Sequence, residues 1–119
     1  MKFLLAILEV ADLERSLEFY HGLLRLPVIE QFTNKNGARI AMVGDQEHAH
    51  LELICKGGAE HDKRDGGMAV SFAVDDAMAI FEKNGKAYSG PICPGPGMRF
   101  YFTLDPDGYR VQLQEFDHK

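Results

Sequence analysis

Three side chains that can bind metals or transfer protons alternate along one short stretch of the chain: His48, His50 and Glu52. Alternate residues of a β-strand point to the same face, so a strand here would bring the three side chains together. Imidazole and carboxylate groups bind divalent metals, and a carboxylate alone can act as a general base. Two interpretations stay open. One is a divalent metal bound through Glu52 with His48 or His50; the other is a pair of histidines at a strand edge or pocket mouth that binds no metal.

A second stretch, "DPDGYRVQLQEF" from Asp105 to Phe116, places Gln112 in a comparable position. Asp-Pro-Asp-Gly is typical of a tight turn, and the residues after it alternate as in a strand. Gln112 stands seven residues after Asp105, and Glu52 stands seven residues after Asp45. The two matching positions therefore hold an acid and a neutral amide, and the amide offers a metal only a neutral carbonyl oxygen.

The stretch "GPICPGPGMRF", which begins at Gly90, is rich in proline and glycine. It lacks the Lys-Ser/Thr ending of a phosphate-binding P-loop, so we predict a rigid loop at the rim of a pocket. Cys93 within it has no evident base nearby to make it a nucleophile. In the aromatic run that follows, Phe100 to Phe102, either Tyr101 or one of the phenylalanines stacks on a planar ligand, or the run packs in the core.

The composition fits one small acidic domain. A chain of 119 residues, 45% of them hydrophobic, can bury one core but not comfortably two independent ones. The formal net charge of -5 and the scattered basic residues argue against nucleic acid as a partner, and the acidity would suit a cationic ligand. Two cysteines predict free thiols in a reducing compartment. The apolar N-terminus meets Glu9 before it is long enough for a signal peptide or membrane span, so we expect a cytoplasmic protein with no membrane partner.

The elements that must position these side chains come in a fixed order. Asp12 is a helix N-cap, leucines then recur at three- and four-residue spacing, and Pro27 ends the pattern. The expected elements of the first half are a strand, this helix and three strands, the strands covering Phe3–Val10, Val28–Thr33, Ala38–Val43 and Ala49–Cys55.

The same order then begins again. A strand is expected over Met68–Val74, and Asp75 or Asp76 caps a short helix that Asn84-Gly85 ends. Three more strands fit around "AYSG", "MRFYFTL" and "RVQLQEF". "R-IAMVGD" in the first half also matches "R-FYFTLD" in the second. We interpret the chain as two βαβββ modules, over about 1–56 and 68–119, joined by a linker at about 57–67.

At this point the sequence resembles a known family. "EVADLERSLEFYHGLLRLPV" is similar to the opening of the vicinal oxygen chelate superfamily, which includes glyoxalase I, bleomycin-resistance proteins and extradiol dioxygenases. "HLELI" and "DPDGYRVQLQEF" resemble the strand motifs that end its two modules, so the resemblance covers nearly the whole chain. It implies an α+β fold in which two βαβββ modules form a cupped, incomplete barrel, and it implies a homodimer.

The resemblance also identifies positions for a metal. In metal-dependent members, one residue from each of four strands holds the ion, and these positions fall on Leu5, Glu52, Ala69 and Gln112. Leu5 and Ala69 carry no donor atom, whereas a divalent cation in a catalytic site generally needs three protein ligands. We therefore expect no metal or other cofactor at the family's usual site.

A pocket without that metal would be apolar with a few converging polar groups, which is a common form of small-ligand site. Strand alternation and the resemblance together predict ten lining residues: Leu5, Ile7, Glu9, His50, Glu52, Ala69, Ser71, Arg99, Tyr101 and Gln112.

Three functions remain open, of which the third is a subunit or accessory domain. The first is a metal-free member of the superfamily that binds a small organic molecule, as bleomycin-resistance proteins do. The second is an enzyme, either a glyoxalase-like lyase or isomerase or a relative of the dioxygenases. It would use a rearranged metal site, or Glu52 alone as a general base.

Overall fold

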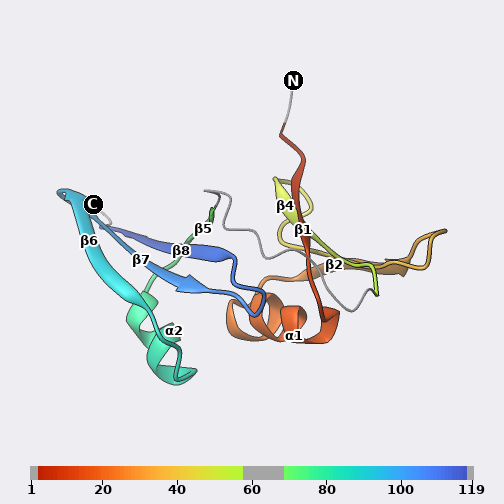
Figure 1. Ribbon diagram of the computed structural model, residues 1–119. Helices are drawn as coiled ribbons and strands as arrows, with labels where there is room; N and C mark the ends of the chain where they lie inside the picture. Colours follow the sequence, from red (N-terminus) through yellow and green to blue (C-terminus); the bar gives the residue numbers. More distant parts are fainter. Residues whose placement is uncertain (1–2, 58–68, 118–119) are drawn as a thin grey trace. The chain divides into compact units, whose positions relative to one another are not determined.

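The computed structural model describes residues 3–57 and 69–117, and the chain divides into two compact units, Met1–Asp62 and Lys63–Lys119. In Figure 1 the elements of unit 1 run from red to yellow-green and those of unit 2 from green to blue. Most of the predicted linker, 57–67, lies outside the described residues. None of the helices in the described ranges is long and apolar enough to cross a membrane.

Unit 1 contains one helical segment and a four-stranded sheet. The strands lie in the order β1-β4-β3-β2, with β1 and β4 parallel and the other neighbours antiparallel. Its elements are β1 (Leu5–Glu9), α1 (Leu13–Leu17), the π-helix η1 (Glu18–Leu23), β2 (Val28–Thr33), β3 (Arg39–Val43) and β4 (His50–Cys55).

The helical segment begins as predicted but ends differently. The Asp12 side chain accepts a hydrogen bond from the Arg15 backbone N–H at 3.1 Å, which confirms the N-cap. The last turns widen into a π-helix, and Leu24 N–H donates to the Phe19 carbonyl at 2.9 Å. Arg25 then adopts a left-handed φ of 65°, so the helix ends before Pro27 is reached.

Unit 2 repeats this topology. Its sheet order is β5-β8-β7-β6, again with one parallel pair, β5 and β8. Asp76 caps its helix and Gly85, with a φ of 57°, follows the C-terminus, as the sequence predicts. The elements are β5 (Ala69–Ala73), α2 (Ala77–Lys83), β6 (Ser89–Gly95), β7 (Met98–Leu104) and β8 (Arg110–Phe116). Two βαβββ modules with an α+β fold are thereby confirmed.

The proline-rich stretch predicted as a loop is instead strand β6. It lies at the edge of the sheet and pairs with β7 through two register shifts, between Ser89 and Ile92 and between Ile92 and Gly95. Proline cannot donate a backbone hydrogen bond, but an edge strand leaves one side unpaired, so Pro91 and Pro94 are tolerated there. The prediction of a rigid loop was wrong for this reason.

Each sheet has one face that its own helix covers and one face that this helix leaves open, here called the open face. In β4, Leu51 and Leu53 are buried while His50 and Glu52 are only half-buried. β8 shows the same alternation, with Val111 and Leu113 buried. Figure 1 shows α2 on one side of the sheet of unit 2. The buried strand residues pack with the helix residues Leu13, Tyr20 and Phe81 to form the core of each unit.

Candidate ligand-binding site

The open face of unit 1 brings together the predicted site residues of β1 and β4. In the parallel pairing, Leu5 lies opposite His50 and Ile7 lies opposite Glu52. Ile7 is 60% exposed, and its neighbour Glu9 forms an ion pair with Lys56 at 3.0 Å. Within the described residues, the Glu52 side chain makes no ion pair or hydrogen bond. This face therefore presents a carboxylate among apolar side chains.

The two histidines near Glu52 are separated by the end of the strand. His50 is the first residue of β4, and its Nδ1 lies 3.0 Å from the His48 carbonyl oxygen. His48 precedes the strand, where its Nδ1 lies 2.7 Å from an Asp45 carboxylate oxygen. The pKa of Asp45 is lowered, mainly by the hydrogen bond that its side chain accepts from the Glu47 backbone N–H and also by this contact with His48. His48 therefore does not share the strand face of Glu52, contrary to the alternation predicted from sequence.

The open face of unit 2 holds a closed set of hydrogen bonds among three side chains. Ser71 lies opposite Gln112 in the pairing of β5 with β8, and Gln114 lies two residues further along β8. The Ser71 hydroxyl donates to Gln112 Oε1 at 2.7 Å, and Gln114 Nε2 donates to the same oxygen at 2.8 Å. Gln114 Nε2 also donates to the Ser71 hydroxyl oxygen at 2.7 Å. We call these three residues the polar triangle.

The hydrogen bonds of the polar triangle determine which side-chain atoms of Gln112 remain available to a ligand. An amide oxygen has two lone-pair positions, and here each already accepts a hydrogen bond. The amide nitrogen of Gln112 then remains as a donor in the described structure. Gln112 therefore presents hydrogen-bond donors rather than a metal-binding oxygen.

Arg99 and Tyr101, predicted as pocket residues, lie on the other face of this sheet. Arg99 Nε donates to Glu115 at 3.0 Å, and this hydrogen bond is the main cause of the raised pKa of Arg99. Tyr101 is 5% exposed and its ring meets Phe81 of α2 edge to face, with centroids 5.9 Å apart. Both side chains thus belong to the helix-covered face, and the structure does not bring them to Gln112.

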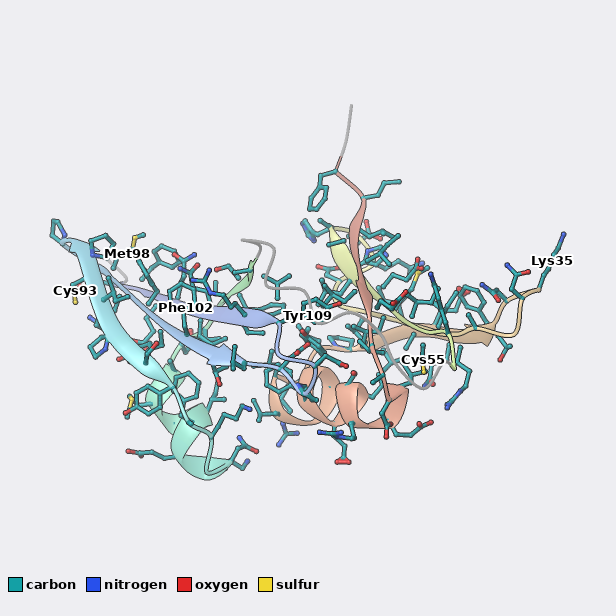
Figure 2. All side chains as sticks on the ribbon, viewed as in Figure 1. Lys35, Cys55, Cys93, Met98, Phe102 and Tyr109 are labelled. Carbon is teal, nitrogen blue, oxygen red and sulfur yellow. The ribbon has the colours of Figure 1, made fainter. Side chains whose placement is uncertain are left out.

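Two phenylalanines occupy the places next to the polar triangle instead. Phe100 lies opposite Gln114, and Phe102 lies opposite Gln112. Their rings contact each other edge to face, with centroids 5.7 Å apart. The label in Figure 2 marks Phe102 on β7. Sequence reasoning considered the whole aromatic run, but a strand that is apolar on both faces gives no alternation that would choose among its members.

The four positions that the resemblance assigns to a metal are Leu5, Glu52, Ala69 and Gln112. Leu5 and Glu52 share the open face of unit 1, and Ala69 and Gln112 share the open face of unit 2. The side chains of Leu5 and Ala69 have no donor atom, and the amide oxygen of Gln112 already accepts two hydrogen bonds. Among the described residues, no three His, Cys, Asp or Glu side chains converge as a metal site would require. The donor set does not fit the metal that the resemblance implies.

Comparison with known protein families identifies the family to which this chain is similar. Residues 3–113 match the model of the glyoxalase/bleomycin resistance protein/dioxygenase superfamily. A lactoylglutathione lyase of Escherichia coli O157:H7 is 32% identical over 97% of this chain and 93% of its own length. A lactoylglutathione lyase of Salmonella typhimurium is 30% identical over the same shares.

Solved structures show the same fold at lower identity. The trypanothione-dependent glyoxalase I of Leishmania major matches with a TM-score of 0.79 and 23% identity, over 98% of this chain and 86% of its own. TnmS3, an antibiotic-binding protein from Streptomyces sp. CB03234, matches with a TM-score of 0.71 and 22% identity, over 98% and 97%.

Proposed function

Because the chain belongs to the glyoxalase/bleomycin resistance protein/dioxygenase superfamily, we propose that it is a member that binds a small organic molecule without the metal of the lyases. The observation that carries the proposal is that the side-chain oxygen of Gln112 already accepts two hydrogen bonds. Its only possible metal-binding atom accepts hydrogen bonds from Ser71 and Gln114. The corresponding positions Leu5 and Ala69 have no donor to compensate.

The proposed ligand contacts come from the open faces. On unit 1 they are Leu5, Ile7, Glu9, His50 and Glu52, and on unit 2 they are Ala69, Ser71 and Gln112. Each open face, taken by itself, has a polar group among small or apolar side chains: the Glu52 carboxylate on unit 1 and the Gln112 amide nitrogen on unit 2. Such a face can orient a ligand by hydrogen bonds while apolar contact supplies affinity. TnmS3 shows that a protein with this fold can bind an antibiotic, so binding is a function the fold supports.

The alternative is a lyase or isomerase, and the names of the relatives favour it. In that case the Glu52 side chain, which makes no ion pair or hydrogen bond within the described residues, would act as a general base. No step of that reaction can rest on a metal at Leu5, Glu52, Ala69 and Gln112, since two of these side chains cannot coordinate one.

A turnover measurement separates the two functions. The purified chain is incubated with Ni²⁺ or Zn²⁺ and then given the hemithioacetal of methylglyoxal and glutathione. We expect no turnover above the uncatalysed rate and far less than one metal ion retained per chain after dialysis. The Escherichia coli relative serves as the positive control in the same assay. Turnover that disappears in a Glu52→Gln variant would favour the enzyme and contradict the proposal.

We also propose a second copy of the chain as a partner, as the resemblance implies. Three apolar side chains at and before β1 support this: Phe3, Leu4 and Ile7 are each at least 60% exposed. Such an apolar patch on an edge strand is a common site of association. Sedimentation at micromolar concentration should give twice the chain mass of 13.3 kDa. A single species at the chain mass would rule the dimer out.

A further inference from the structure

Unit 2 has a groove at the end of β7 and β8 that the sequence did not reveal. Its volume is about 770 Å³, within the range of roughly 300–1,000 Å³ that is usual for small-molecule sites. None of the four metal positions of the superfamily is among its lining residues. The lining includes Lys86, Tyr88, Ser89, Phe102, Leu104 and Arg110.

Arg110 lies over an aromatic ring of the neighbouring strand. Its guanidinium carbon lies 4.7 Å from the centroid of the Phe102 ring. A guanidinium that contacts a ring with its face keeps its N–H groups available, because these groups lie in the guanidinium plane and point away from the ring. Within the described parts of the chain, Arg110 forms no ion pair with a carboxylate. A guanidinium with N–H donors not used by a carboxylate of the described residues matches the geometry of a carboxylate or similar anion.

The rest of the groove suits a flat apolar body. Tyr88 is 40% exposed and stacks on Phe81, with ring centroids 4.6 Å apart and planes 6° apart. Phe102 lies below the Arg110 guanidinium, and Leu104 is 52% exposed. Aromatic side chains of this kind favour stacking with another ring.

The charge of the groove is opposite in sign to that of the whole chain. Lys86 and Arg110 are cationic, and the single carboxylate among the lining residues belongs to Asp107, which is 7% exposed. The chain as a whole has a formal charge of -5, which at the level of composition would suit a cationic ligand. Because the field close to a site decides which ion it attracts, the groove favours an anion.

We propose that this groove binds a flat organic anion, of which an aromatic carboxylate is the simplest kind. Arg110 pairs with the anionic group, and the rings of Phe102 and Tyr88 contact the flat part of the molecule. This site goes beyond the proposed function, because it needs neither Glu52 nor Gln112.

A matched pair of probes tests the proposal: 2-naphthoate, and 2-naphthamide, which has the same rings without the charge. Each is titrated into the isotope-labelled chain, and the backbone amide shifts are followed by NMR. We expect naphthoate to shift amides of residues 86–89, 102–104 and 110, and to bind more tightly than naphthamide. The Arg110→Gln variant should bind naphthoate about tenfold more weakly or worse, close to its affinity for naphthamide. Arg110→Lys, which keeps the charge but not the planar fork, should fall between.

The control is Arg15→Gln, which removes an arginine that is likewise exposed, from α1 of unit 1, and should leave naphthoate binding unchanged. Equal affinity for the two probes, or unchanged naphthoate binding in Arg110→Gln, would overturn the proposal. Sedimentation of the same variants adds a second criterion. If Arg110→Gln changes the oligomeric state together with naphthoate binding, the groove is a contact between copies of the chain and not a ligand site.

Discussion

Glu115→Ala is expected to lose about 2–3 kcal/mol of the free energy of unfolding, because it leaves a buried backbone N–H without an acceptor. Glu115 is 7% exposed, and one carboxylate oxygen accepts from the Ala77 N–H at 2.6 Å. Ala77 is the first residue of α2 and is fully buried, so its N–H is shielded from solvent and depends on this acceptor. A carboxylate at this end of a helix also has a favourable interaction with the helix dipole.

The other oxygen of the same carboxylate connects the helix to the sheet. It accepts from Arg99 Nε at 3.0 Å, and Arg99 also lies 3.5 Å from an Asp117 oxygen. Urea denaturation of Glu115→Ala, Glu115→Gln and Asp76→Ala would test this account. Glu115→Gln keeps one acceptor and should lose less than half as much, and Asp76→Ala should lose about 1 kcal/mol as an ordinary N-cap. Equal losses for Glu115→Ala and Glu115→Gln would show that the contact with Ala77 is unimportant.

The features that the sequence predicted are those that local chemistry decides. Asp12 and Asp76 cap their helices because an Asp side chain can reach the backbone N–H three residues on, whatever surrounds it. The strand Val28–Thr33 has the bounds expected from its apolar and β-branched residues. The repeat was also visible, because both halves need the same side chains at the same places to build the same sheet.

The features that the sequence did not predict depend on which strands pair with each other in a sheet. β6 runs through Pro91 and Pro94, which is possible only because it lies at a sheet edge, and edge positions cannot be read from one strand alone. Tyr101 was predicted to line the pocket, but the run around it is apolar on both faces and does not show which face the side chain takes. Its pairing with Leu113 decides that it faces the helix.

In the candidate site, too, some properties follow from the residue types alone and others only from contacts in the folded chain. That Leu5 and Ala69 cannot hold a metal follows from their identity alone. That Gln112 has its oxygen occupied follows only from the register that places Ser71 opposite it. Arg110 was not among the predicted lining residues, because an exposed arginine in a sequence looks like any solvated charge. Its contact with Phe102 arises between two antiparallel strands.

Phe81→Ala is expected to have the largest effect on stability, a loss of roughly 3–5 kcal/mol. Phe81 is 1% exposed, and its ring contacts both Tyr88 and Tyr101. Removal of the ring leaves a cavity between α2 and the sheet that the short helix can only partly close. Phe81→Leu should lose roughly 1.5 kcal/mol at most, because it keeps most of the volume. Urea denaturation of both variants measures the difference, and similar values would mean that the core rearranges around the change.

The ionisation of Tyr101 gives this prediction a second readout. Burial is the main cause that raises the pKa of the Tyr101 hydroxyl above its usual value. The folded state therefore holds this proton more tightly than the unfolded state, in which the pKa is near 10. The resulting stabilisation is fully present below that pH and is lost as the pH rises through the pKa of the folded state. In Phe81→Ala, water in the cavity should bring the pKa of Tyr101 back toward its usual value, and ultraviolet titration of tyrosinate would detect the shift. If the titration of Tyr101 is unchanged while stability falls, the cavity stays dry, and the loss of stability comes from missing contacts alone.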